Sequence, residues 1–482
     1  AALMQTRGAT PVSFSRDHYD AVVVGAGPNG LAAAITLARK SRSVLLVEAK
    51  ETVGGGTRSA GLTLPGFVHD VCSTVQPLAL SSPFFRQLGL ERFGLEWIQP
   101  EIPLAQPFED GTALCLHRSL DETAAGLGVD GGAWRDLFGP FVENHERLLA
   151  DALKPLPIPS HPILMARFGL KALRTARGLA ESAFRGARTR ALFAGLAAHA
   201  MIPLEKPATA AFGILLGVLA HGAGWPVIKG GSQRLADALA ASFTESGGEI
   251  RTGVEVRSMG DLPKAERYFF DVTPRQLLAI GGLGLSEGYR AKLSRFRYGP
   301  GVCKADWALA APIPWKADAC RKAGTIHLGA SLEEIDDSIR AAHRGERFPL
   351  PYVVLAQQSL FDPSRAPAGK HTAWAYCHVP HASPGDMAGL IEERIERVAP
   401  GFRDLILARH SMPPAAMERY NANYVGGDIN GGLQDWTQLY SRPILSLFPY
   451  RTSRGDVYLC SSSTPPGGGV HGLCGFYAAR GL

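Results

Sequence analysis

The chain of 482 residues has little cysteine, and its seven cysteines follow no spacing that is typical of a site. No CxxC pair occurs, because the cysteines lie at positions 72, 115, 303, 320, 377, 460 and 474. This spacing argues against a redox-active disulfide, a zinc site and the disulfide framework of a secreted protein. We therefore expect no metal site, and we interpret Cys72 and Cys474 as packing residues.

The chain also lacks an extreme charge and a long apolar run. Its 50 Lys and Arg against 44 Asp and Glu leave a net charge of +6, too small over this length to indicate nucleic-acid binding. The longest strongly apolar run, ATAAFGILLGVLA at 208–220, is shorter than the roughly 20 residues of a membrane-spanning helix. We expect a cytoplasmic protein, soluble or peripheral to a membrane, with two domains.

A basic segment leaves a contact with a membrane surface open. The stretch 168–190 has six basic residues and one acid, Glu181. Such a segment beside an apolar one suits a membrane surface, where basic side chains meet anionic head groups. However, the basic residues do not oppose one hydrophobic stripe, so a solvated face is the interpretation that we favour.

Glycine, by contrast, occurs in clusters, and the first cluster has the spacing of a nucleotide site. The stretch YDAVVVGAGPNGLAAAITLARK predicts a buried strand at 19–24, a glycine turn and a helix. Gly25 permits the turn, Gly27 lets the backbone approach a pyrophosphate, and Gly30 lets the helix pack against the strand. A second predicted strand ends at Glu48, where a carboxylate accepts hydrogen bonds from an adenosine ribose. This order of elements predicts dinucleotide binding.

A second glycine cluster, AKETVGGGTRS, follows Glu48 and favours FAD over a nicotinamide nucleotide. A plain nicotinamide domain requires no glycines there. The longer FAD needs backbone access and a cationic group farther along the same ligand, which Gly55, Gly56 and Arg58 supply. An ordinary flexible loop is the alternative interpretation of this cluster.

Two later segments make a family resemblance specific. They are VIKGGSQRLADALAASFTESGGEIRTGVEV, at 227–256, and YLCSSSTPPGGGVHGLCGFYAA near the C-terminus. With the two glycine clusters, they resemble the phytoene desaturase-like family of FAD-dependent oxidoreductases. Within that family they are most similar to the group called pyridine nucleotide-disulfide oxidoreductase domain-containing protein 2. The resemblance covers most of the chain from Asp17 onward.

The resemblance implies an α/β fold, in which a Rossmann-type FAD-binding domain is interleaved with an α+β substrate domain of helices and a mixed or antiparallel sheet. We expect the FAD-binding domain to comprise residues 17–105, 225–275 and 440–482, and the substrate-binding domain to comprise 106–224 and 276–439. Alternating apolar residues in PYVVLAQQSL and HTAWAYCHV predict two strands of the second sheet.

The resemblance also implies which residues bind FAD. The three glycines at 467–469 are expected at the flavin end, with their backbone amides turned toward the cofactor, and Val256 is expected against the adenine. The full expected set is Gly25, Gly27, Pro28, Asn29, Gly30, Glu48, Ala49, Gly55, Gly56, Thr57, Arg58, Val256, Gly467, Gly468, Gly469 and Val470.

Three residues beside these motifs are candidates for catalysis. They are His471 in GGGVHG, and His69 with Asp70 in GFVHDVCS. Histidine titrates near neutrality, so either ring could accept or relay a proton, and a structural hydrogen-bonding role is the equal alternative. No second dinucleotide fingerprint follows a predicted strand. We therefore expect a diffusible electron acceptor, O2 or a quinone.

The sequence thus predicts an FAD-dependent oxidoreductase, a desaturase, dehydrogenase or isomerase, that acts on a hydrophobic small molecule. The family name alone suggests a polyene or lipid-like compound. Two alternatives stay open: an amine oxidase-like flavoenzyme, and a non-catalytic binding protein with a flavin fold. The sequence leaves the oligomeric state open.

Overall fold

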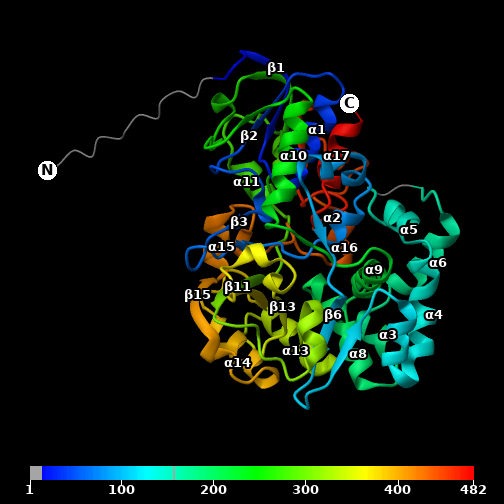
Figure 1. Ribbon diagram of the computed structural model, residues 1–482. Coiled ribbons are helices and arrows are strands. Elements are labelled where there is room, and N and C mark those ends of the chain that lie inside the picture. The colour runs from blue at the N-terminus through cyan, green and yellow to red at the C-terminus, as the bar shows by residue number, and fades with distance from the viewer. Residues whose placement is uncertain (1–13, 156–157, 482) are drawn as a thin grey trace.

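The computed structural model of the protein describes residues 14–155 and 158–481. In it, the predicted glycine turn joins β1 (His18–Val24), a strand of a parallel sheet, to helix α1 (Pro28–Ala38). Five strands form this sheet in the order β16-β10-β1-β2-β9, and every neighbouring pair is parallel. They are β1 (His18–Val24), β2 (Val44–Val47), β9 (Glu249–Arg251), β10 (Lys264–Phe270) and β16 (Val457–Leu459). The sheet forms the upper lobe of the molecule in Figure 1.

Helices cover both faces of the parallel sheet. One face packs against α1 (Pro28–Ala38), α10 (Gln233–Glu245) and α17 (Leu473–Arg480), which come from distant parts of the sequence and lie together in Figure 1. Helix α1 is rich in Ala and Leu and is buried on every side, so small side chains suit its crowded position. The other face packs against α11 (Pro274–Ala279) and α12 (Glu287–Leu293).

A seven-stranded mixed sheet forms the centre of the lower lobe. Its order is β15-β11-β14-β13-β12-β6-β7, and only the pair of β12 with β6 is parallel. The strands are β6 (Ile102–Pro107), β7 (Ala113–Leu116), β11 (Gly301–Leu309), β12 (Ala323–Leu328), β13 (Val353–Ala356), β14 (His371–Val379) and β15 (Ile406–Met412). The two strands predicted from alternation are confirmed as β13 and β14.

The helices of the lower lobe lie mainly on one face of this sheet. They are α3 (Leu120–Gly126), α4 (Gly131–Val142), α5 (His145–Ala152), α6 (Pro162–Ala172), α7 (Ala176–Ala183), α8 (Ala187–Ala197), α9 (Thr209–Gly222) and α13 (Leu332–His343). The opposite face packs against α14 (Ala388–Val398). Within the described residues, no helix is long and apolar enough to cross a membrane.

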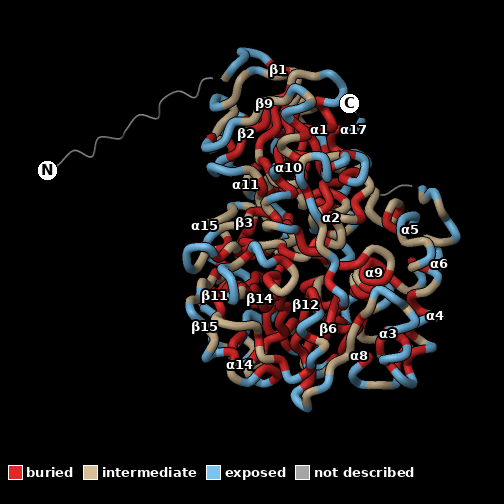
Figure 2. The backbone as a smooth tube through the Cα atoms, viewed as in Figure 1, coloured by how far each residue is buried: buried red, intermediate tan, exposed pale blue. Residues whose placement is uncertain are grey.

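Short elements connect the two lobes. They are α2 (Pro77–Ser81), α15 (Pro414–Tyr420), α16 (Trp436–Leu439), and the two-stranded pairs β3 (Ser59–Ala60) with β4 (His69–Asp70) and β5 (Trp97–Ile98) with β8 (Val227–Ile228). Figure 2 shows buried residues through the interior of both lobes.

The predicted fold class, a Rossmann-type domain interleaved with an α+β domain, is confirmed. The predicted domain segments stay a proposal, and two elements bear on their limits. Strand β6 crosses the limit placed between residues 105 and 106, and it belongs to the seven-stranded sheet. Helix α12 lies in the segment assigned to the substrate domain, yet it packs on the parallel sheet.

Candidate active site

A cavity of about 920 Å³ extends from the glycine turn of the upper lobe to the seven-stranded sheet of the lower lobe. A volume of this size is near the upper end for small-molecule and cofactor sites. Its walls come from segments that are far apart in the sequence, including the β1–α1 turn, residues 72–78, β11, β14 and Val470. A ligand that fills it would contact both lobes.

The β1–α1 turn has no room for side chains at its three fingerprint glycines. Gly25 has a φ of +99°, which favours glycine. A Cβ on Gly30 would lie 1.9 Å from the carbonyl oxygen of Gly25, and a Cβ on Gly27 would lie 2.9 Å from Oδ2 of Asp271. Gly25 and Gly27 line the cavity, and Gly30 instead permits the close packing of helix and strand.

Glu48 is held at the cavity wall with its carboxylate fixed on both sides. Its Oε2 atom accepts a hydrogen bond from the amide of Ala26 at 2.8 Å, and Oε1 accepts one from the amide of Lys50 at 2.9 Å. Arg58 Nη2 lies 3.1 Å from Oε1, and both side chains are largely buried. Arg58 also donates two hydrogen bonds to the carbonyl oxygen of Thr52. These contacts preorganise the acid that was predicted to bind a ribose.

Asp271 is a site residue that the sequence analysis missed. It follows β10, lines the cavity, and accepts a hydrogen bond at Oδ2 from the amide of Gly30 at 2.8 Å. Burial, with a smaller contribution from the charge of Glu48, raises the pKa of Asp271 to about 7, while the hydrogen bond from Gly30 acts in the opposite direction. A carboxyl group therefore stands at the N-terminus of α1, where the motif predicts an anionic pyrophosphate.

The second glycine cluster lies next to two tyrosines that come from α15 and the loop after it. Gly56 has no space for a Cβ, which would lie 2.4 Å from Oη of Tyr424. The hydroxyl of Tyr420 donates to the carbonyl oxygen of Gly55 at 2.9 Å, and the guanidinium of Arg58 lies over the Tyr420 ring. Gly55, Gly56 and Arg58 line the cavity, so this loop is part of its wall.

The C-terminal glycines divide into one that lines the cavity and two that pack against protein. Gly469 and Val470 line the cavity, just before α17. A Cβ on Gly467 would lie 2.7 Å from Nη1 of Arg442, and one on Gly468 would lie 2.9 Å from the carbonyl oxygen of Asn430. Bare backbone is thus required at 467 and 468 by protein packing.

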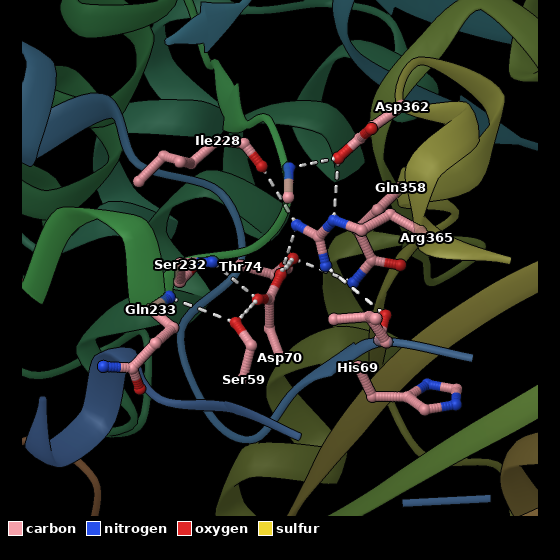
Figure 3. Close-up of polar contacts among 12 residues, drawn as sticks. Ser59, His69, Asp70, Thr74, Ile228, Ser232, Gln233, Gln358, Asp362 and Arg365 are labelled. Atoms are coloured by element: carbon pink, nitrogen blue, oxygen red, sulfur yellow. Dashed lines mark hydrogen bonds and ion pairs between the residues drawn. The ribbon is translucent and has the colours of Figure 1, made fainter. Parts of the chain in front are cut away.

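Asp70 is enclosed in a buried polar network, which Figure 3 shows. Its Oδ2 atom lies 3.1 Å from Nη2 of Arg365, and its Oδ1 atom accepts from the amide of Ser232 at 2.8 Å and the hydroxyl of Ser59 at 2.7 Å. Burial alone would raise the pKa of Asp70, but Arg365 and the hydrogen bonds hold it below its usual value. The network joins β4, the segment before α10 and the segment around Arg365.

The two candidate histidines lie beside the cavity, outside the set of residues that line it. His69 Nε2 lies 2.8 Å from the hydroxyl of Thr63, and its ring points away from the Asp70 network in Figure 3. His471 Nδ1 accepts from the amide of Leu473 at 3.0 Å. Burial lowers the pKa of each ring to about 4. Their catalytic role stays a prediction.

One face of the seven-stranded sheet forms the floor of the cavity. The strand register pairs Lys304 of β11 with Tyr376 of β14, Tyr376 with Val354 of β13, and Val354 with His327 of β12. Alternate residues of a strand share a face, so Val302, Trp374 and Thr325 lie on this side too, and they also line the cavity. At about 4.8 Å for each step between strands, Lys304 and His327 lie about 14 Å apart.

Lys304 is a second residue that the sequence analysis missed. Its side chain is buried, lines the cavity and forms an ion pair with Asp306, the next residue on the same face of β11. Asp306 lies 3.7 Å from Nδ1 of His69 and 3.9 Å from Nδ1 of His410. A lysine and an aspartate two positions apart in an otherwise apolar strand was the signal available in the sequence.

The cavity residues fit FAD. The glycine turn leaves a cradle that a Cβ at Gly27 would reduce, the fixed carboxylate of Glu48 suits a ribose, and the wall continues without a break to the lower lobe. Of the predicted cofactor residues, those that line the cavity are Gly25, Gly27, Pro28, Asn29, Glu48, Ala49, Gly55, Gly56, Arg58, Val256, Gly469 and Val470. The remaining predicted cofactor residues do not line it: Gly30, Thr57, Gly467 and Gly468.

The chain is similar to known oxidoreductases over most of its length. Residues 23–82 match the family model for an NAD(P)-binding Rossmann-like domain. The mouse (Mus musculus) protein named pyridine nucleotide-disulfide oxidoreductase domain-containing protein 2 is 28% identical, over 96% of this chain and 93% of its own length. Hydroxyneurosporene desaturase of Cereibacter sphaeroides is 32% identical over 55% of this chain and 58% of its own.

A solved structure extends the similarity to the whole fold. Cyclohexylamine oxidase from Brevibacterium oxydans superposes with a TM-score of 0.59, covering 96% of this chain and 98% of its own, at 15% identity. At this identity the likeness shows the fold alone. The sequence relatives bear out the resemblance that the motifs predicted, and this chain is an FAD-dependent oxidoreductase similar to the phytoene desaturase-like enzymes.

Proposed function

We propose that this enzyme removes hydrogen from, or isomerises, an uncharged and largely apolar small molecule of the polyene or lipid-like class. The observation that carries the proposal is the lining of the lower half of the cavity. Apolar and aromatic side chains predominate there: Met201, Leu216, Trp225, Val302, Val354, Trp374, Tyr376 and Met417. Burying apolar ligand surface against such walls is favourable by about 25 cal/mol for each Å².

The charge of the lower half disfavours the amine alternative. Among the lining residues that the structure describes, every carboxylate belongs to the upper half: Glu48, Glu255 and Asp271. The charged side chain that the floor contributes is the cation Lys304. Lys304 is neutralised by its ion pair with Asp306, so no unpaired carboxylate among the described floor residues would compensate a protonated amine for its lost hydration, and its burial there is unfavourable. An uncharged substrate avoids this penalty.

The chain's own residues hold the cofactor and enclose the substrate. The backbone of the β1–α1 turn and the fixed pair of Glu48 and Arg58 would hold the adenosine half, and Gly469 and Val470 would lie at the flavin half. A bound flavin supplies a hydride acceptor. The sheet floor and Met201 would exclude water from the reacting carbon, and Tyr376 and Trp374 would orient an extended apolar molecule along the floor.

The electron acceptor in this proposal is O2 or a quinone. The match to the Rossmann-like family model, at 23–82, covers the segment that the FAD proposal already uses. Residues 281–288, the other glycine-rich stretch, begin as a loop with positive φ at Gly282 and Gly284 and lead into α12. A diffusible acceptor would reach the flavin through the same cavity as the substrate.

A peripheral contact with a membrane is the remaining part of the proposal. Helix α6 exposes Ile163 and Leu170, residues that are 72% and 79% accessible, and Leu173 follows at 58%. Arg167 lies between them on the exposed surface. Sedimentation with anionic vesicles tests this point, and the expected result is binding that weakens when Leu170 is changed to Glu. Equal recovery of both proteins with the vesicles would contradict it.

Anaerobic mixing with a panel of compounds tests the proposed substrate class. The panel contains isoprenoid hydrocarbons and alcohols on one side and putrescine and cyclohexylamine on the other. We expect the visible flavin band to bleach with an isoprenoid at a rate of about 1 per second or faster, which is a turnover-like rate. Bleaching by an amine alone at such a rate would contradict the proposal.

A further inference from the structure

Four polar residues line the lower half of the cavity on elements other than β11, the strand that carries Lys304. His199 lies in the turn after α8, Trp225 in the loop after α9, Thr325 on β12 and Trp374 on β14, and all four line the cavity. The His199 ring lies 6.4 Å from the Trp225 ring. Strand β13 separates β14 from β12, so Trp374 and Thr325 are about 10 Å apart.

Three of these residues have a buried polar atom that lacks a partner. Among the described residues, no hydrogen bond reaches Nε1 of Trp225, Nε1 of Trp374 or Oγ1 of Thr325. The three residues are nearly fully buried, with 3%, 7% and 2% of their surface exposed. An unpaired buried donor costs about 1–3 kcal/mol, and in native proteins such a group commonly meets a water or a ligand.

His199 reaches the same place as one half of a histidine pair. Its Nε2 atom lies 3.1 Å from Nε2 of His327, whose Nδ1 atom has no partner within the described residues. Burial lowers the pKa of His199 to about 4, and burial together with His199 lowers the pKa of His327 well below its usual value. Both rings are therefore neutral near pH 7, and each has one N–H and one free lone pair.

A neutral pair of this kind can either donate or accept a hydrogen bond at Nδ1 of His199. The contact between the two Nε2 atoms uses one N–H and one lone pair, which leaves one of each on the two Nδ1 atoms. If His199 donates to His327, its own Nδ1 accepts, and in the other tautomer its Nδ1 donates. The pair therefore matches a hydroxyl group as well as a carbonyl group.

We propose that His199, Trp225, Thr325 and Trp374 form a subsite for an uncharged oxygen function, a hydroxyl or carbonyl group, on the otherwise apolar substrate. The inference rests on the proposed function and names the substrate more closely: an isoprenoid-like alcohol or ketone in place of a pure hydrocarbon. The indole N–H groups donate to the oxygen, and the histidine pair supplies the complementary donor or acceptor. A carboxylate or an amine is disfavoured because these four side chains carry no charge, and the neighbouring Lys304 and Asp306 are paired with each other.

Matched ligands test the subsite on the oxidised holoprotein. The pairs farnesol with farnesene and geraniol with myrcene differ mainly in the oxygen, and anaerobic titration of the bound-flavin spectrum gives their dissociation constants. We expect each alcohol to bind at least about fivefold more tightly than its hydrocarbon, the effect of about one net hydrogen bond.

Two substitutions locate the effect. Trp225→Phe keeps the aromatic packing and removes one hydrogen-bond donor. His199→Phe removes the imidazole whose Nδ1 atom would meet the ligand. Each should raise the dissociation constant of the alcohol about fivefold while that of the hydrocarbon changes less than twofold. Trp315→Phe is the matched control, because Trp315 is buried in the core on the opposite face of the sheet. It should leave both constants unchanged.

The outcomes separate this inference from the proposed function. Equal affinity of the native protein for alcohol and hydrocarbon would overturn the subsite. The proposal of an apolar substrate would not be affected. A variant that weakens both ligands equally would also overturn the subsite, because loss of packing would then explain the effect. Failure of every isoprenoid to perturb the flavin would overturn the proposed function, and the subsite with it.

Discussion

Nη2 of Arg365 lies 3.1 Å from Oδ2 of Asp70, and neither side chain has any exposed surface. This ion pair and three further hydrogen bonds hold Asp70 in the connection between the lobes, and its catalytic role stays a prediction. The hydroxyl of Thr74, a cavity residue, donates to the same carboxylate at 2.5 Å. The network thus holds the segment at 72–76 that lines the cavity.

Arg365→Met should strongly destabilise the protein. The substitution leaves Asp70 as an uncompensated buried charge, and breaking a buried pair in this way costs about 3–5 kcal/mol. Urea unfolding measures the loss. Arg344→Met is the control, because Arg344 forms an exposed ion pair with Glu346. This variant should unfold at the same urea concentration as the native protein. A loss in Arg365→Met no larger than in the control would show that the network contributes little.

Gly27→Val should fold and lose FAD. A Cβ at this position points toward Asp271 Oδ2 at 2.9 Å and takes space from the predicted pyrophosphate. The ratio of flavin to protein after purification measures the effect, with Gly126→Val as control, since a Cβ on Gly126 meets nothing within 4 Å. The companion change Glu48→Gln should weaken FAD binding more gently. Full FAD occupancy in the folded Gly27→Val variant would contradict the role of this glycine turn in holding the pyrophosphate.

Asp271→Asn should change how stability depends on pH. The pKa of Asp271 is raised to about 7 in the folded protein, chiefly by burial, so the native state binds a proton that the unfolded chain releases near its usual value of 3.8. The stability from this proton is present below about pH 4 and is lost as the pH rises through 7. Asparagine keeps an acceptor for the Gly30 amide without the charge.

Thermal unfolding of the FAD-free protein tests this linkage. We expect Asp271→Asn to melt at a higher temperature than the native protein near pH 8, and the difference to shrink near pH 5. FAD should also bind more tightly to the variant near pH 8, because a charge next to the pyrophosphate is gone. A difference in melting temperature that is constant between the two pH values would contradict the assignment.

NADH and NADPH should reduce the enzyme slowly or not at all. A hydride must leave a nicotinamide that is held in a near-attack geometry, and the sequence has no second dinucleotide fingerprint to hold it. Stopped-flow mixing under anaerobic conditions follows the visible flavin band, and a quinone or O2 should reoxidise flavin that dithionite has reduced. Reduction by either nicotinamide at about 1 per second or faster would exclude this view of the acceptor.

The upper half of the cavity was largely predictable because its residues are close in sequence. Gly25, Gly27 and Glu48 belong to one strand–helix–strand unit, where local spacing determines which groups meet. Asp271 escaped notice because it reaches Gly30 through the pairing of β10 with β1, across 241 positions of sequence. No local pattern encodes that approach.

The lining of the lower half of the cavity is brought together by strand register, which cannot be read from a single sequence. Lys304, Tyr376 and His327 form part of one row only because four strands pair in one order. His199 and His327 meet across 128 positions because the turn after α8 packs on this face of the sheet. The candidates chosen by nearness to glycine motifs, His69 and His471, lie beside the cavity lining, since sequence neighbours of a wall residue often point behind the wall.

Cofactor identification tests the central claim, that the glycine segments of this chain enclose noncovalently bound FAD, most directly. The purified protein is precipitated with acid, and the supernatant is analysed by chromatography and mass spectrometry. The account predicts a colourless pellet and FAD in the supernatant, in an amount close to that of the protein. FMN in the supernatant, or a yellow pellet above a colourless supernatant, would contradict it.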